Sequence, residues 1–348
     1  QHLCNLIRSR ETPILCGQAV GSSHGLMAAE LALNLQKPIM AITPDQSSAY
    51  LMMDDVAFFL KERKKAPPVF VFPHLELLPY EAQVPELTIR MERLSSIQYL
   101  IENTPLENRF LGTPMVVIAP ISAVLKRLPA LSFYEKKALR CTRGKTLSRD
   151  QISAWLVEQG YEFRELVAQR GDFSIRGDIV DIYSYSYPEP VRIEFWGDEV
   201  DSIRLFHISN QRSVETIEEA VFYPGNEDVL IQESLAAGVA LEPLPRLFGE
   251  DTVVLFSNID EVEKEGNSFR YIVDKCYFET THPSDDHEVH LSEDDFHKTH
   301  DVLLKPPDIL YLTLAEFEEG IENLPSLQFT EFTLDPSPDH LNLGCATP

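Results

Sequence analysis

The chain has 348 residues, a length that suits two or three domains, and 44% of them are hydrophobic. The formal net charge of −25 repels DNA phosphates and argues against autonomous DNA binding. No stretch approaches the roughly 18 consecutive apolar residues of a membrane span, and the five cysteines are scattered and never form CxxC. We therefore expect a cytoplasmic protein without membrane contact, disulfide framework or zinc site.

The negative charge is concentrated in the second part of the chain. From residue 210 onward there are 30 Asp and Glu against 7 Lys and Arg, a balance of −23, which leaves −2 of the total −25 for residues 1–209. Residues 126–149, in contrast, contain eight basic residues and one acidic residue. Two interpretations of this basic stretch stay open, a solvated helix face or a local basic surface near residue 140.

Strand-like and helix-like patterns alternate over the first 128 residues. Short apolar runs with proline at their edges predict strands, and the amphipathic stretches between them predict helices. Such strands indicate a parallel βαβ sheet that is covered on both faces and binds ligands at its strand C-termini, where the loop at Gly17 lies. The expected strands are residues 13–17, 38–43, 67–73 and 114–120, and the expected helices are residues 22–36, 47–61 and 85–102.

The loop at Gly17 is similar to a phosphate-binding P-loop whose key residues are replaced. A working P-loop reads GxxxxGK[ST], because its amides cradle phosphates, its lysine reaches the β/γ-phosphates and its hydroxyl holds Mg²⁺. Here Ser22 replaces the second glycine, Ser23 replaces the lysine and His24 replaces the hydroxyl residue that holds magnesium. No lysine occurs before Lys37. ATP hydrolysis would lack its main charge stabilisation. We predict a degenerate loop with no catalytic residue, cofactor or metal; an anion at the helix N-terminus stays open.

The pattern changes to β-rich after about residue 129. A helix is expected over residues 148–161, and successive strands joined by tight turns then predict an antiparallel meander, which would be a small separate module. From about residue 210 the α/β pattern returns. The predicted fold class is α/β, a parallel-sheet domain with a degenerate P-loop interrupted by an inserted β-rich (α+β) module. The predicted divisions are 1–128 and 210–335 for the α/β domain, 129–209 for the inserted module and 336–348 for a linker.

Residues 170–206 read RGDFSIRGDIVDIYSYSYPEPVRIEFWGDEVDSIRLF. This stretch resembles a long block, RG-x-F-x-x-RG-x-[IV]-[VL]-[DE]-I followed by RIEFFGDEVDSIR, that the excinuclease protein UvrB shares with the bacterial transcription-repair coupling factors. The likeness covers residues 10–260 and is closer to the coupling factors. It implies a helicase-like α/β platform that carries an inserted partner-binding module. The other matching stretches are ITPDQSSAYLMMDDVAFFL, PHLELLPYE, VVIAPISAVLKRLP and KTLSRDQISAWLVEQGY.

Two departures from UvrB favour the amino-terminal region of the coupling factors. UvrB has an intact P-loop lysine and an aromatic β-hairpin that clamps DNA, whereas here residues 78–94 lead almost directly into a helix. The resemblance implies that the full family protein is an ATP-dependent DNA translocase that removes stalled RNA polymerase and recruits UvrA for nucleotide excision repair. This chain is then expected to be a non-catalytic recruitment fragment. Its partners would be UvrA and its own C-terminal motor and regulatory domains, through which it would meet RNA polymerase and DNA.

The resemblance also implies binding residues on the inserted module, where the family contacts UvrA through basic and aromatic side chains. On matching positions these are Arg176, Arg192 and Trp196. Arginine pairs bidentately with carboxylates and an exposed aromatic serves as an anchor. Strand alternation places Arg192, Glu194 and Trp196 on one face. In the alternative interpretation, Trp196 covers the module's edge and Arg192 pairs with Glu194 or a cross-strand acid. Weaker candidates are Arg164, Arg170 and Arg204.

Two other functions stay open at this point. The chain could be an autoinhibitory or structural platform that packs on the absent motor domains. It could also be a P-loop ATPase or helicase of the UvrB type, against which Ser23, the absent hairpin and the acidic charge argue. A histidine group in the acidic part matches no standard metal spacing and favours a polar loop. Its members are His282, His287, His290, His297 and His300.

Overall fold

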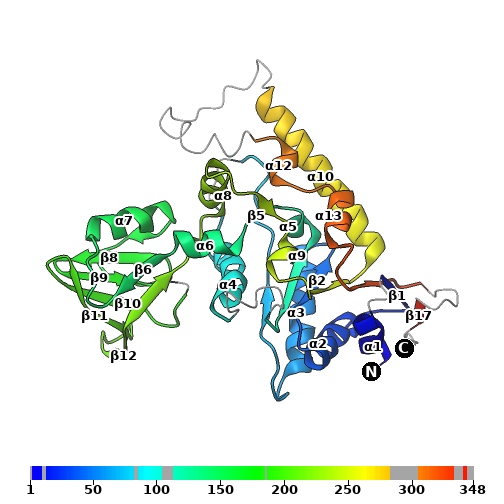
Figure 1. Cartoon of the computed structure of the whole chain (residues 1–348), viewed down its shortest axis with the longest axis horizontal. Helices are drawn as coiled ribbons and strands as arrows, with labels where there is room; N and C mark the ends of the chain where they lie inside the picture. Colours follow the sequence, from blue (N-terminus) through cyan, green and yellow to red (C-terminus); the bar gives the residue numbers. More distant parts are fainter. Residues whose placement is uncertain are drawn as a thin grey trace. The chain divides into compact units, whose positions relative to one another are not determined.

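The computed structural model describes residues 2–9, 13–81, 85–103, 113–184, 186–282, 305–332 and 340–342. The chain divides into two compact units (Figure 1). The first unit is assembled from two separate stretches, Gln1–Ala130 and Val239–Pro348, and the second unit is the continuous stretch Leu131–Gly238. The second unit is therefore an insertion in the sequence of the first.

A seven-stranded parallel sheet forms the centre of the first unit. Its strands, in spatial order, are β17 (His340–Asn342), β1 (Ile14–Gly17), β16 (Ser326–Phe329), β15 (Val253–Phe256), β2 (Ile39–Thr43), β4 (Val116–Pro120) and β3 (Val69–Val71). The neighbouring strands β15, β2 and β4 are buried along their whole length. This is the pattern of parallel strands covered on both faces, and it explains why the sequence shows them as continuous apolar runs.

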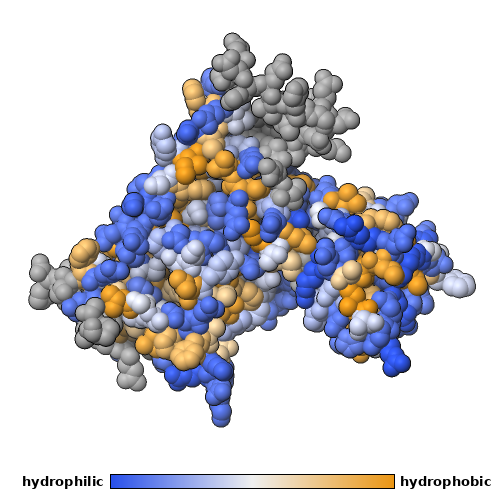
Figure 2. All heavy atoms as spheres, turned by 180° about the vertical axis from the view of Figure 1, so that it is seen from behind, coloured by the Kyte–Doolittle hydropathy of each residue, from blue (hydrophilic) through white to orange (hydrophobic). Residues whose placement is uncertain are grey.

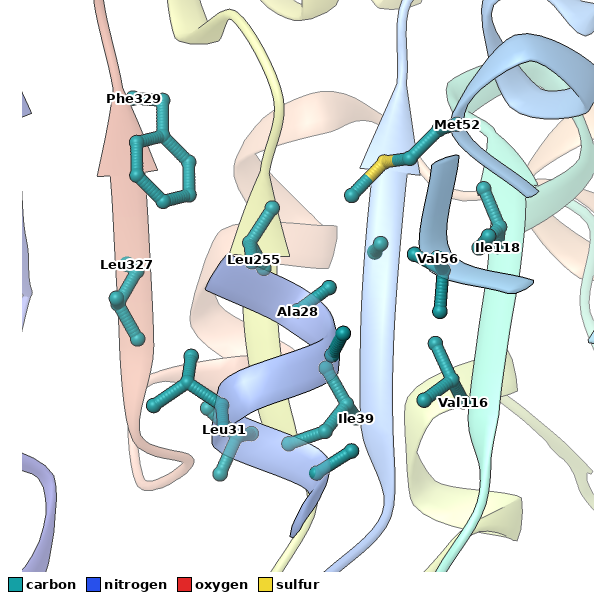
Figure 3. Close-up of a cluster of buried hydrophobic side chains, with 14 of the residues drawn as sticks. Ala28, Leu31, Ile39, Met52, Val56, Val116, Ile118, Leu255, Leu327 and Phe329 are labelled. Atoms are coloured by element: carbon teal, nitrogen blue, oxygen red, sulfur yellow. The ribbon is translucent and has the colours of Figure 1, made fainter. Parts of the chain in front are cut away.

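Helices cover both faces of this sheet. On one face, α2 (Ser23–Leu35) packs with Ala28 beside Leu255, and α3 (Gln46–Leu60) packs with Val56 beside Ile118, as Figure 3 shows. On the other face, the ring of Phe317 in α13 (Leu314–Ile321) meets that of Phe256 edge-on, 6.4 Å between centroids. The remaining described elements of this unit are α1 (His2–Ser9), α4 (Leu87–Asn103), α5 (Ile121–Val124), α9 (Leu244–Leu247), α10 (Ile259–Thr281), α12 (Pro307–Leu310) and the strand pair β5 (Leu128–Pro129) with β14 (Leu241–Glu242).

The second unit is built on a six-stranded, mainly antiparallel sheet. In spatial order its strands are β12 (Ser213–Ile217), β11 (Glu199–Phe206), β10 (Val191–Trp196), β9 (Ile179–Ile182), β8 (Asp172–Arg176) and β7 (Glu162–Phe163). Ile152 and Leu156 of α7 (Arg149–Glu158) share a buried core with Ile193 and Ile203, so α7 covers one face. The α/β class with a separate β-rich sheet is thus confirmed. Its other elements are α6 (Leu131–Lys137), β6 (Leu139–Thr142), β13 (Glu219–Phe222) and α8 (Glu227–Ala236).

The structure differs from the predicted divisions at two places. The second unit runs to Gly238 and not to residue 209, because β12 extends the meander and β13 pairs with β6, with Ala220 opposite Cys141 in the core. Strand β12 is exposed along almost its whole length, so it lacks the apolar alternation that marks a strand. At the end of the chain, the predicted linker contains β17, which pairs with β1.

The described helices include none that is both long and apolar enough to cross a lipid bilayer. On the face shown in Figure 2, hydrophobic residues form small patches between hydrophilic ones. Small apolar patches of this kind are normal on a protein surface. Of the histidine group, only His282 lies within the described residues; its ring stacks on Phe278, 4.6 Å between centroids, and the other four histidines lie outside them.

His74, which follows β3, makes the first unit sensitive to acid. Its Nδ1 accepts a hydrogen bond from the Glu76 amide at 3.1 Å. Burial, and then the charges of Arg93 and Lys126, lower the pKa of His74 from 6.5 to about 4. Because this pKa is lower in the folded state than in the unfolded state, neutral His74 is linked to a contribution to folding stability. This contribution is fully present above about pH 6.5 and is lost as the pH falls from 6.5 toward 4.

We expect this histidine to contribute a measurable part of the acid sensitivity. Between pH 7.5 and pH 5, the wild type should lose on the order of 1–2 kcal/mol more unfolding free energy than His74→Gln. Urea unfolding followed by circular dichroism at the two pH values measures the difference. Equal losses in both proteins would show that folding does not lower the pKa of His74, so that its protonation is not linked to folding.

Candidate partner-binding site

The two faces of β10 differ in chemistry. Val191, Ile193 and Phe195 are buried in the core beneath α7, whereas Arg192 and Glu194 are partly exposed and Trp196 is 83% exposed. The predicted alternation along this strand is correct. Directly paired residues of antiparallel strands project to the same side of a sheet, so the register extends this side to neighbouring strands. We call it the polar face; it contains Arg176, Asp181, Arg192, Glu194, Trp196, Ser202 and Arg204.

Asp181 of β9 lies at the centre of the polar face and is only 1% exposed. Its Oδ1 accepts from Nε of Arg192 at 2.7 Å, and its Oδ2 accepts from Nη2 of Arg192 at 2.8 Å and from Nη2 of Arg176 at 2.6 Å. One buried carboxylate therefore holds two of the predicted arginines. Asp181 is not among the residues predicted from the sequence; the usable signal is an acid inside the apolar run IVDI, directly opposite Arg192 in the register.

Arg192 is held from several sides. Besides its bidentate pair with Asp181, its Nη2 donates to Oε1 of Gln211 at 2.7 Å, and its guanidinium lies 4.3 Å from the ring centroid of Phe206. The hydrogen bond to Asp181 is the main cause that raises the pKa of Arg192 above its ordinary value. The cross-strand acid considered in the sequence is thus present, on β9.

The more accessible candidates are Arg176 and Trp196. The Arg176 side chain is 40% exposed, against 12% for Arg192. Trp196 ends β10, just before Gly197, whose positive φ of 63° allows the tight turn into β11. A cation and a large aromatic side chain are therefore both accessible on this face. Such side chains suit a surface that is carboxylate-rich and has a pocket for a ring.

The three weaker candidates lie in different surroundings. Arg204 belongs to the polar face, where it pairs with Glu194, and Glu194 also accepts from Oγ of Ser202 at 2.7 Å. Arg164 pairs with Glu162 beside β7. Arg170 donates to the carbonyls of Ser184 at 3.2 Å and Tyr187 at 3.0 Å, so it braces a loop. The structure thus brings Arg204, but not Arg170, together with the main candidates.

The basic stretch at residues 126–149 is largely neutralised. Within the described part of the chain, five of its eight cations form ion pairs with acids that lie elsewhere in the sequence, and Lys126 is 7% exposed. These pairings favour the interpretation as ordinary solvated surface over a basic docking surface. The pairs are Arg127 with Glu316, Lys137 with Glu233, Arg140 with Glu219, Arg143 with Glu218, and Arg149 with Asp178.

In the degenerate loop, backbone amides bond to the chain itself. Gly17 ends β1, and the next two amides, of Gln18 and Ala19, donate to the carbonyls of Phe332 at 3.0 Å and Thr330 at 3.2 Å. A working P-loop directs its amides at phosphate oxygens instead. The loop thus continues the pairing of β1 with the chain that leaves β16.

The side chains at the three replaced positions also turn toward the protein. Oγ of Ser22 donates to Oδ1 of Asp55 at 2.9 Å, and Oγ of Ser23 donates to the carbonyl of Val20 at 2.8 Å. The His24 ring meets Phe329 edge-on at 5.1 Å, and burial lowers the pKa of this histidine. The loop is bound into the fold through each of these residues.

Restoring the P-loop sequence should not restore nucleotide binding. In the triple variant Ser22→Gly, Ser23→Lys, His24→Ser, we expect the amides of Gln18 and Ala19 to keep their hydrogen bonds to the segment that follows β16. For both the wild type and the variant, we expect the dissociation constant for a fluorescent ATP analogue to lie above about 1 mM. Fluorescence titration with Mg²⁺ tests this. Micromolar binding by the folded variant would mean that side chains alone inactivated the loop.

Comparison with known proteins identifies the type of domain to which the second unit is similar. Residues 139–227 match the UvrB interaction domain, and this range includes the whole polar face. The chain is similar to the amino-terminal region of transcription-repair-coupling factors, which confirms the resemblance found in the sequence. It is 34% identical to the factor of Bacillus subtilis over 216 residues (62% of this chain, 17% of the relative) and 29% identical to that of Escherichia coli over 213 residues (61% and 17%).

The likeness extends to the excinuclease protein. The UvrABC system protein B of Thermosipho africanus is 26% identical over 222 residues, which are 63% of this chain and 33% of that protein. The chain spans about 17% of the length of the coupling factors that it matches.

Proposed function

We propose that this chain recruits the damage-recognition protein UvrA to stalled transcription complexes and that the polar face of the second unit is its docking surface. The observation that carries this proposal is the exposure of Arg176 and Trp196 on one face of a unit that matches the UvrB interaction domain. The similarity to transcription-repair-coupling factors supports the connection with transcription.

The proposed contact uses a small number of strong interactions. Trp196 would enter a pocket on the partner, and the Arg176 guanidinium would pair with a carboxylate beside that pocket. An arginine–carboxylate pair at the edge of an interface mainly affects the association rate and its dependence on salt. The complementary patch of UvrA should therefore be acidic and contain an apolar depression.

In this proposal the chain does not hydrolyse ATP. The loop lacks the P-loop lysine, and its amides at Gln18 and Ala19 donate to carbonyls of the segment that follows β16. Translocation on DNA and contact with RNA polymerase would belong to other parts of a longer protein, to which this chain would supply the UvrA-binding surface.

Calorimetric titration of the chain with purified UvrA tests the proposal. We expect saturable binding that weakens as salt concentration rises, and unchanged binding by Arg140→Ala, which alters an exposed arginine of the same unit outside the polar face. The absence of binding by the folded wild-type chain would overturn the proposal. An autoinhibitory or structural platform that packs on the motor domains would then be the function to test.

A further inference from the structure

We infer that Arg192 is a positioning residue: with Asp181 it fixes the guanidinium of Arg176, which together with Trp196 contacts the partner. This inference rests on the proposed function and divides its binding residues into two kinds. The resemblance alone treats Arg176 and Arg192 alike, whereas the structure gives them different surroundings.

Arg192 is committed to the protein's own groups. Three of its five N–H bonds point to Asp181 and Gln211, and one side of its guanidinium lies on the ring of Phe206. With 12% of its side chain exposed, it has little area for a partner to cover. Replacing these contacts on binding would leave the carboxylate of Asp181 without its bidentate partner, an unfavourable exchange at a buried site.

Arg176 has the opposite character. Its side chain is 40% exposed and donates to Oδ2 of Asp181, so other N–H groups of the guanidinium can reach a partner while this bond is kept. The two arginines and one aspartate carry a net charge of +1, which an acidic group on UvrA would balance. Because Asp181 is held rigidly by Arg192, Arg176 is already ordered before binding, and less conformational entropy is lost.

A double-mutant cycle on UvrA binding tests this division. We expect Arg192→Gln and Arg176→Ala each to weaken binding by about tenfold. If Arg192 acts through Arg176, the double variant should bind within about twofold of Arg176→Ala alone, because nothing is left to position. A second cycle with Asp181→Asn in place of Arg192→Gln should give the same result. This second cycle tests the inference if Arg192→Gln does not fold.

A measurement without UvrA complements the cycle. NMR relaxation of the Arg176 Nε–H bond should show increased mobility in Asp181→Asn and Arg192→Gln, and no change in Arg140→Ala. Independent, multiplicative losses in both cycles would overturn the inference and leave the proposed function standing, since Arg192 would then be a direct contact. Absence of wild-type binding would overturn both.

Discussion

Replacing Trp196 with alanine is expected to weaken UvrA binding by at least about 30-fold, the factor that corresponds to the 2 kcal/mol of an interface hot spot. The side chain is 83% exposed, so its removal takes little packing from the core of the unit. The loss should therefore appear in binding and not in folding. Calorimetry gives the affinity, and the fluorescence of the remaining tryptophan, Trp155, reports whether the second unit is folded.

Two matched variants sharpen this test. Trp196→Phe keeps an aromatic anchor and should retain most of the affinity. Phe163→Ala removes another exposed aromatic side chain (58% exposed) from β7, at the edge of the same sheet, and should bind as the wild type does. If Trp196→Ala binds UvrA normally, Trp196 is not the anchor and the polar face is not the docking surface as proposed.

Gly25→Ala is expected to destabilise the first unit by about 2 kcal/mol. Gly25 lies in α2 where this helix crosses α3, and a Cβ atom there would be 2.5 Å from Cβ of Asp55 and 3.3 Å from the amide nitrogen of Val56. Both are atoms at or next to the backbone, so a rotamer change cannot relieve the clash. The two helices must separate, and contacts in the core beneath them are lost.

Gly320→Ala is the matched control, because a Cβ at this position in α13 would meet its nearest neighbour, Cγ of Pro243, at an ordinary 3.8 Å. It should be neutral or stabilising by about 0.5 kcal/mol, since alanine favours a helix more than glycine. Urea unfolding by circular dichroism measures both variants. The only tryptophans, Trp155 and Trp196, belong to the second unit, so their fluorescence follows that unit separately. Equal stability of the two variants would contradict the close crossing of α2 and α3.

Much of the fold could be predicted because its strands are buried on both faces. Strands β2, β4 and β15 appear in the sequence as continuous apolar runs between turn residues. Helix α10 was harder to predict, because only four of its 23 residues are buried and its acidic residues are typical of a solvated loop. Strand β12 lacks a pattern for a related reason, since neither of its faces is buried.

The candidate site could be predicted only in part. The period of two places Arg192 and Trp196 on one face whatever the neighbouring strands are. The role of Asp181 depends on which residue of β9 lies opposite Arg192, and this register is a property of the folded sheet. The basic stretch shows the same limit, because Lys137 pairs with Glu233, which lies 96 positions away in the sequence.

The interrupted order of the sheet has a consequence for synthesis on the ribosome. Strand β1 pairs only with β16 and β17 among the described strands. Ile14 can therefore pair with its partner Leu327 only after residue 327 has been synthesised. All strands of the second unit, in contrast, lie between Leu131 and Gly238. At about 5–20 residues per second, the chain from Val239 to Phe329 takes roughly 5–20 s to emerge. During this interval the insert can complete its sheet while β1 still lacks both of its neighbours, so the nascent α/β unit exposes unpaired strand edges for longer than the insert does.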